Sequence, residues 1–209
     1  MKIAIIGAGN VGAVLGKAWS AKGHDVVYAA SSPDSPRVRA AVGASGPKAR
    51  SDTVANAAKS ADVIVLAVPA SEAEKIVKPL PLEGKVLLDA TNPLNADFSG
   101  LTVGYNDSAG ERLARAARGA RVVKIFNSTG AGNMGNPIYQ DGTATMFYAG
   151  DDAEAKQIAA KLAVDCGFDA IDAGPLQNAR LLEPLAMLWI CLAYGAGMGP
   201  DVAFRLMRR

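Results

Sequence analysis

Histidine and cysteine are nearly absent from this chain of 209 residues, which contains one histidine and two cysteines. Cys166 and Cys191 do not form a closely spaced set of ligands, so neither a disulfide scaffold nor a zinc site is expected. A single histidine, His24, leaves little room for a His-based catalytic triad. We therefore predict no metal site and no hydrolase of the triad type.

Excess charge and long apolar runs are also missing. The formal net charge is only +2, which gives no reason to expect binding to nucleic acid or to a membrane surface. The longest apolar run, Pro184–Met198, is shorter than the roughly 20 residues that span a bilayer. Met1–Gly7 predicts a strand entering a glycine turn rather than a signal peptide. We therefore expect a cytoplasmic protein without a membrane segment.

Apolar segments rich in β-branched residues alternate with segments of helical periodicity along most of the chain. Short continuous apolar runs of this kind are typical of strands buried on both faces of a parallel sheet. The predicted strands are Ile3–Ile6, Val26–Ala29, Val63–Val68, Lys85–Asp89 and Val122–Phe126, and the predicted helices are Val11–Lys22, Ser71–Lys78 and Ser108–Arg118. This alternation predicts an α/β fold, a Rossmann-type doubly wound and mostly parallel sheet with helices on both faces.

The last third of the chain continues the alternation and then becomes helical. Thr145–Ala149 and Phe168–Asp172 are further predicted strands, and a helix starts in the acidic segment 151–154 between them. From Ala179 the pattern is helical to near the end, with a break around Gly195–Pro200. We therefore predict a Rossmann domain over residues 1–178 and a helical C-terminal extension over residues 179–209.

A glycine motif follows the first predicted strand. Gly7, Gly9 and Gly12 form G-x-G-x-x-G, and Asn10 and Val11 open the helix that comes next. In this context the first glycine permits a tight turn, the second lets a pyrophosphate approach the backbone, and the third lets the helix pack against the strand. The helix N-terminus then offers free N–H groups to phosphates. The motif predicts a dinucleotide site, with a purely structural tight turn as the alternative.

The segment after the second strand lacks the acid that would hold the ribose 2′-hydroxyl of NAD. Ser31 and Ser32 stand there instead, and Arg37 and Arg39 follow. Hydroxyl donors and forked guanidinium groups suit the dianionic 2′-phosphate of NADP. The segment predicts a preference for NADP(H), and a solvated basic loop is the alternative.

Small and neutral residues follow the other central strands, where ligands bind in open α/β sheets. Ala67, Val68 and Pro69 offer a flat floor for a nicotinamide ring, and Asn92 and Asn127 offer amide groups to ribose or carboxamide. Turn chemistry is the alternative for each asparagine.

No convincing acid–base pair stands at these strand ends. Asp89 and Lys124 lie near this rim, but either can belong to a structural ion pair. Hydride transfer between two bound rings requires position and exclusion of water more than a proton donor. The pattern therefore favours a flavin-like or deazaflavin-like acceptor over a simple ketone, and no residue is predicted to be catalytic.

Over nearly its whole length the chain resembles the NADPH-dependent reductases of the deazaflavin coenzyme F420, and it is similar to the cytosolic reductase domains of STEAP metalloreductases. The resemblance runs through Gly7–Gly12, Gly23–His24, Leu66–Pro69, Asp89–Pro93, Val123–Asn127, Gly150–Asp152 and Asp172–Leu176, and it is most specific in Ala179–Ile190. It implies hydride transfer between NADPH and F420, FMN or FAD. Ala30–Ser32 and Ala70 depart from the family, which commonly has Gly-Ser-Arg at the first place and often an aromatic residue at the second.

The resemblance also gives a role to the C-terminal apolar segment, Leu181–Tyr194. Because a helix that is apolar all round must be buried, we expect this segment to pack on the sheet and against a second subunit of a homodimer. Residues 129–142 are too glycine-rich for a regular element and are interpreted as a lid over the acceptor.

Two other functions stay open at this stage. One is an imine or carbonyl reductase of the pyrroline-5-carboxylate reductase type, and the other is a non-catalytic NADP-sensing module.

Overall fold

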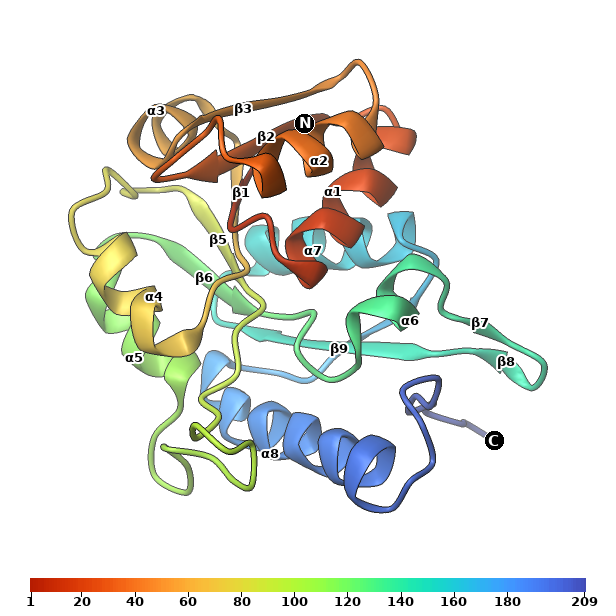
Figure 1. Ribbon diagram of the computed structural model, residues 1–209. Helices are drawn as coiled ribbons and strands as arrows, with labels where there is room; N and C mark the ends of the chain where they lie inside the picture. The colour runs from red at the N-terminus through yellow and green to blue at the C-terminus, as the bar shows by residue number, and fades with distance from the viewer.

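The computed structural model describes residues 1–209 and has one eight-stranded sheet at its centre (Figure 1). Its strands are β1 (Lys2–Ile6), β2 (Asp25–Ala30), β3 (Ala49–Thr53), β4 (Val63–Leu66), β5 (Val86–Asp89), β6 (Arg121–Lys124), β9 (Thr145–Gly150) and β10 (Asp169–Asp172). They lie in the order β10-β9-β6-β5-β4-β1-β2-β3. All neighbours pair in parallel except β6 and β9, so the predicted doubly wound, mostly parallel sheet is confirmed.

Helices cover both faces of the sheet. One face packs against α1 (Asn10–Ala21), α2 (Pro36–Ser45), α6 (Ala131–Gly135) and α7 (Ala153–Asp165). The other face packs against α3 (Val54–Ser60), α4 (Ala70–Val77) and α5 (Ala109–Ala116). The last helix, α8 (Ala179–Ile190), continues as a π-helical turn over Cys191–Gly195 and lies outside these layers at the bottom of Figure 1. No helix is long and apolar enough to cross a membrane.

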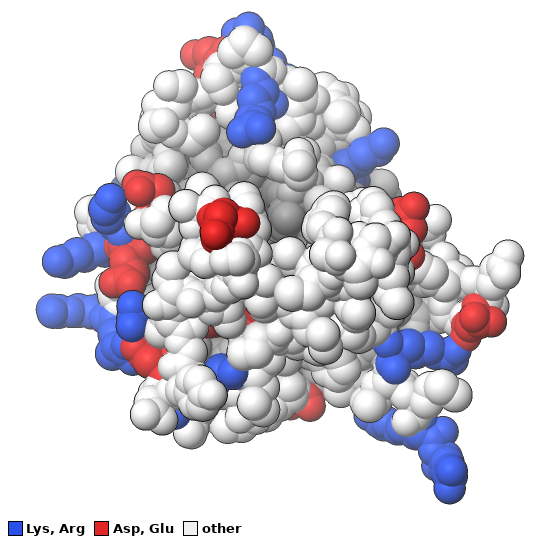
Figure 2. Space-filling view, turned by 60° about the horizontal axis from the view of Figure 1, so that its bottom comes forward, with Lys and Arg blue, Asp and Glu red and all other residues white.

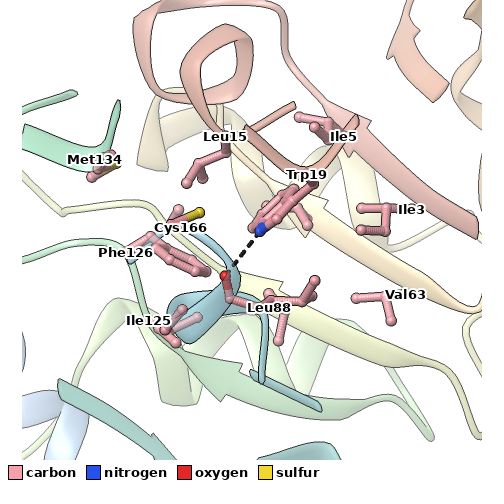
Figure 3. Packing of buried hydrophobic residues seen from close by; sticks show 14 of the residues in the cluster. Ile3, Ile5, Leu15, Trp19, Val63, Leu88, Ile125, Phe126, Met134 and Cys166 are labelled. Carbon is pink, nitrogen blue, oxygen red and sulfur yellow. Dashed lines mark hydrogen bonds between the residues drawn. The ribbon is translucent and has the colours of Figure 1, made fainter. Parts of the chain in front are cut away.

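The core on the α1 face is built around Trp19 (Figure 3). Trp19 is fully buried, and its indole N–H donates to the Leu162 carbonyl of α7 at 2.9 Å. Its ring packs against that of Phe126 in a T-shaped arrangement, with centroids 5.5 Å apart. Because Phe126 follows β6, this contact joins the first helix to the carboxyl end of a strand that is distant in sequence.

Several elements were missed or wrongly interpreted from sequence. The helices α2, α3 and α6, the strand β3 and the small hairpin β7–β8 (Ile138–Tyr139 with Gly142–Thr143) were not predicted. The basic segment after β2 is therefore not a loop, because Arg37 and Arg39 lie in α2. Residues 129–142 contain α6 and the hairpin, so the expectation of no regular element is wrong. Asn133 helps to hold this segment in place, since its side-chain amide donates to the carbonyls of Pro200 and Val202.

The C-terminal extension is helical only in its first half. The predicted break is present after Gly195, but the chain does not return to helix. Instead the final residues follow the start of β9, where the Thr145 N–H donates to the Phe204 carbonyl. The N–H of Leu206 donates to the Thr145 hydroxyl at 2.9 Å. The end of the chain is thus tied to the sheet by hydrogen bonds rather than by helix packing.

Candidate functional site

The carboxyl ends of five strands meet at one edge of the sheet. The residue after each of β1, β4, β5 and β6 donates its N–H to a carbonyl of the neighbouring strand: Gly7 to Ala29 of β2, Ala67 to Ile6, Ala90 to Leu66 and Ile125 to Asp89. The strand order reverses between β1 and β4, so the glycine turn lies at the topological switch point where open α/β sheets bind ligands. The structure therefore brings the predicted strand-end residues to a common edge.

The three motif glycines have different surroundings. A Cβ on Gly7 would lie 2.3 Å from the Ala67 carbonyl oxygen, and φ at Gly7 is +107°, so both space and backbone conformation require glycine. A Cβ on Gly12 would lie 2.0 Å from the Gly7 carbonyl oxygen. A Cβ on Gly9 would meet nothing within 4 Å, and φ there is −77°. The protein's own packing therefore explains Gly7 and Gly12 but leaves Gly9 unexplained, and open space at Gly9 fits a ligand that approaches the backbone.

The residues after β2 lie beside this turn. Ser31 and Ser32 are exposed directly after the strand, and Arg37 is exposed in the first turn of α2, which packs against α1. Arg39 is also exposed, but its guanidinium donates to the Asp34 carbonyl. The N-cap residue of α2, Ser35, makes no side-chain capping bond, so first-turn N–H groups stay available to an anion. Neither arginine forms an ion pair with a carboxylate, unlike most basic residues near α5.

Asn92 and Asn127 are brought together and link two strand ends. The Asn92 amide donates to the Asn127 carbonyl at 2.8 Å, and the Asn127 amide donates to Asn92 Oδ1 at 3.0 Å. Asn127 also donates to the Leu182 carbonyl of α8 at 2.9 Å, whereas its buried Oδ1 has no hydrogen-bond partner. Both side-chain N–H groups of Asn127 and one of Asn92 are thus used inside the protein, and the Asn127 side chain has only its Oδ1 left as an acceptor for a ligand.

The backbone is strained where β6 meets this edge. Phe126 has a φ of +58°, in the left-handed region that bulky residues seldom occupy, and it is fully buried. This conformation turns the chain so that Asn127 faces Asn92 instead of continuing the strand. Such strain costs about 1–3 kcal/mol and is concentrated at functional sites.

A fully buried group of charges lies beneath the strand ends, and it includes Asp89 and Lys124 as a structural ion pair. Lys124 Nζ lies 2.8 Å from Asp89 Oδ2 and 2.9 Å from Glu183 Oε1 of α8. Burial by itself would lower the pKa of Lys124, but the two carboxylates outweigh it and hold this pKa above its usual value. Glu183 also accepts the N–H groups of Ala109 and Gly110 at the start of α5, both at 3.0 Å.

This charge group is therefore a structural link and not a pair at the surface of the site. Sequence reasoning missed Glu183, although a signal was present: a single acid inside the apolar run 181–194 needs a buried partner of opposite charge.

Two hollows are lined in part by the loop that follows β5. The first, of 720 Å³, lies between the loop after β5 and the end of α8 and is mostly apolar, with Leu94, Phe98, Met187, Ile190 and Tyr194 among its lining residues. The second, of 360 Å³, runs from Thr91 and Pro93 between α4 and α5. Figure 2, which turns the α8 side toward the reader, shows a recess in the middle of the view with mostly uncharged atoms around it.

Comparisons with known proteins agree with this geometry. The family model described as NADP oxidoreductase, coenzyme F420-dependent, matches residues 2–93. An F420-dependent NADP reductase from Methanothermobacter thermautotrophicus is 34% identical over 211 residues, covering 92% of this chain and 89% of that protein. The metalloreductase STEAP3 of Rattus norvegicus is 34% identical over 110 residues, covering 51% of this chain and 21% of its own length. Both predicted resemblances are confirmed.

Solved structures extend the comparison to the whole chain. A protein of Arthrobacter sp. FB24, provisionally assigned as an F420-dependent NADP reductase, has a TM-score of 0.90 and 30% identity, with 100% of each chain covered. A reductive aminase from Aspergillus terreus in complex with NADPH has a TM-score of 0.69 at 20% identity, covering 94% of this chain and 63% of its own. At that identity the second likeness concerns the fold alone.

Proposed function

Because the chain belongs to the family of F420-dependent NADP reductases, we propose that it transfers hydride between NADP(H) and a flat ring acceptor such as coenzyme F420 or a flavin. The observation that carries the proposal is the open space at Gly9 in a glycine turn at the switch point of the sheet. A pyrophosphate is the ligand that this arrangement suits, since backbone N–H groups and the start of α1 face it without an intervening side chain.

The residues for the cofactor follow from the order of the strand ends. The diphosphate is assigned to Gly7, Gly9, Asn10, Val11 and Gly12, at the start of α1. The 2′-phosphate is assigned to Ser31, Ser32, Arg37 and Arg39, and the nicotinamide half to Ala67, Val68, Pro69, Asn92 and Asn127. When bound, NADPH supplies a hydride from C4 of its nicotinamide ring.

The acceptor is assigned to the apolar pocket beside α8. Aromatic and aliphatic side chains such as Phe98, Met187 and Tyr194 suit a flat ring, and Leu94 connects the pocket to the segment that carries Asn92. The task of these residues is to hold the ring against the cofactor and to exclude water. We accordingly assign no covalent or metal-dependent step to the protein.

Isotope transfer tests this function. With NADPH deuterated at the transferred C4 position, we expect the label to appear in reduced F420, where the hydride is bound to carbon and does not exchange with water. With a flavin the transferred hydride is bound to nitrogen and exchanges with water, so the expected result there is a slower rate with the deuterated cofactor. Chelators should leave the rate unchanged with either acceptor. The measurement is mass spectrometry of the reduced acceptor after incubation with the purified protein.

Other results of the same assay favour other functions. Loss of the label to solvent during reduction of F420, with a rate that depends on added metal, would overturn the mechanism. Turnover confined to imines or ketones would favour the imine or carbonyl reductase, and NADPH binding without turnover across a broad acceptor panel would favour the sensing module.

Cofactor preference is a separate prediction. We expect NADPH to bind at least about tenfold more tightly than NADH, or about 1.4 kcal/mol, because neutral and basic groups follow β2. Arg37→Ala should remove most of this preference and leave NADH affinity unchanged, since only the 2′-phosphate differs between the two cofactors. Fluorescence titration with both cofactors at one ionic strength measures the effect. Lys161→Ala, on α7, is the matched control, and equal affinity of the unaltered protein for both cofactors would contradict the assignment.

We also propose that residues 179–209 contribute both to the acceptor site and to a homodimer contact. One side of α8 is buried through Leu182, Glu183 and Ala186, while Leu181 and Leu188 are 66% and 49% exposed. Exposed apolar side chains on a helix are typical of a subunit interface. Light scattering across a dilution series tests this, with twice the monomer mass as the expected result and a clean monomer as the contrary one.

A further inference from the structure

Basic side chains gather on the flank formed by α4 and α5, apart from the cofactor residues. A groove of 940 Å³ runs between these helices, and five of its nine lining residues are Lys or Arg whereas two are acidic. Because the whole chain carries a net charge of only +2, the groove concentrates positive charge locally. In Figure 2 the charged side chains lie mainly on the left flank, where Figure 1 places α4 and α5, and the centre of the view is largely uncharged.

The cations in the groove are only partly compensated within the protein. Asp107 holds Arg112 at 2.8 Å and Arg115 at 2.9 Å, so one carboxylate orients two guanidinium groups. Hydrogen bonds from Arg112, and further ones from Arg115, lower the pKa of Asp107 to about 2, so this acid is ionised at neutral pH. Lys78 and Arg118 are exposed and form no ion pair. Guanidinium groups held in this way retain N–H donors for an oxyanion.

The groove is continuous with the site at the strand ends. Glu74, Lys75 and Arg112 line both the basic groove and the 360 Å³ hollow that begins at Thr91 and Pro93. That hollow in turn shares Leu94 with the apolar pocket assigned to the acceptor ring. An apolar, then a polar, then a basic environment thus follow one another from α8 to the far side of α5.

We propose that this groove binds the anionic side chain of the acceptor, its phosphate or carboxylate groups, while the ring lies in the apolar pocket. The inference rests on the proposed function, because it concerns the substrate of the same site. F420 carries a phosphodiester and carboxylates on the side chain of its ring, and FMN carries a phosphate. A row of cations leading away from an apolar pocket complements a molecule with a flat apolar end and an anionic end.

Equilibrium binding measured by ligand fluorescence tests the proposal without relying on turnover. Two pairs of ligands isolate the anionic groups: F420 against the deazaflavin alcohol that lacks phosphate and carboxylates, and FMN against riboflavin. We expect at least one anionic member to bind about tenfold more tightly than its neutral partner, with an advantage that falls as salt is added.

The variant Lys78→Ala/Arg118→Ala, which changes two exposed and unpaired side chains, should remove most of this advantage without altering affinity for the neutral partners. Lys161→Ala, an exposed lysine on α7, should leave all affinities unchanged.

These measurements distinguish failure of the groove's proposed role from failure of the proposed hydride transfer. Equal binding of the anionic and neutral ligands, or a double variant that weakens both members of a pair equally, would overturn the role of the groove. Hydride transfer to none of the four ligands would instead overturn the proposed function. An effect on the F420 pair alone assigns the groove to carboxylates, and an effect on both pairs assigns it to phosphate.

Discussion

Replacing Gly9 with Val is expected to weaken NADPH binding by about 100-fold or more, about 2.7 kcal/mol, in a chain that still folds. The space beyond Gly9 is open in the protein, and its φ of −77° is accessible to any residue, so the fold itself does not require glycine there. A branched side chain at this place fills the space that the diphosphate needs next to the backbone. Because Val is a poorer N-cap than Gly, a stability loss of about 1 kcal/mol is expected as well.

Two other glycines make this experiment specific. Gly43→Val, at an exposed position of α2 with equally open surroundings, should change neither binding nor folding. Gly12→Ala should instead destabilise the fold, because its Cβ would lie 2.0 Å from the Gly7 carbonyl oxygen. Fluorescence titration with NADPH and thermal unfolding of the three variants separate these effects. A folded Gly9→Val protein with normal affinity would mean that the glycine turn is structural only.

The sequence predicted the elements whose signal is local. Continuous runs such as Val63–Leu66 are buried on both faces, and their β-branched residues identify them without knowledge of their neighbours. The strand β3, Ala49–Thr53, was missed because it lies at the edge of the sheet and its residues Ala-Arg-Ser-Asp-Thr carry no apolar pattern. The helix α2 was missed for a related reason, since only Val38, Ala41 and Ser45 of its ten residues are buried.

In the candidate site, too, the sequence predicted what depends on a local motif and not what depends on residues distant in sequence. The glycine turn is a local motif, and its context of strand and helix was sufficient to place it. What Asn92 and Asn127 do depends on each other and on Leu182, three residues that are distant in sequence, so neither could be predicted to use its amide N–H groups inside the protein. The left-handed conformation of Phe126 has no signal in the sequence, because phenylalanine rarely adopts it.

Glu183→Gln is expected to destabilise the protein by about 3–5 kcal/mol, as removal of one partner from a buried charge group does elsewhere. Glu183 is 1% exposed and uses both oxygens, for Lys124 and for the N–H groups at the start of α5. Glutamine has one acceptor oxygen, so its amide N–H₂ would face Lys124 or a backbone N–H, each of which is also a donor. Glu72→Gln, in the exposed pair with Lys75, is the matched control and should change stability by less than about 0.5 kcal/mol.

The pH dependence of unfolding gives the experiment a second measurement. The pKa of Lys124 is raised by its carboxylates above the usual 10.5, so its contribution to stability is fully present below that value and is lost as pH rises through the folded-state pKa. Without the Glu183 charge this folded-state pKa falls, and stability should begin to decline at a lower pH than in the unaltered protein. Urea unfolding between neutral and strongly alkaline pH measures both the loss at pH 7 and this displacement.

The effect should also reach the site, since Glu183 joins α8 to β6 and α5 through a single carboxylate. The pocket proposed for the acceptor is lined by Met187, Ile190 and Tyr194 from α8 and its continuation, whereas the glycine turn lies between β1 and α1. Loosening α8 should therefore raise KM for the acceptor more than KM for NADPH. A Glu183→Gln protein with unaltered stability, or with equal changes in both KM values, would mean that the buried charges do not hold the acceptor pocket in place.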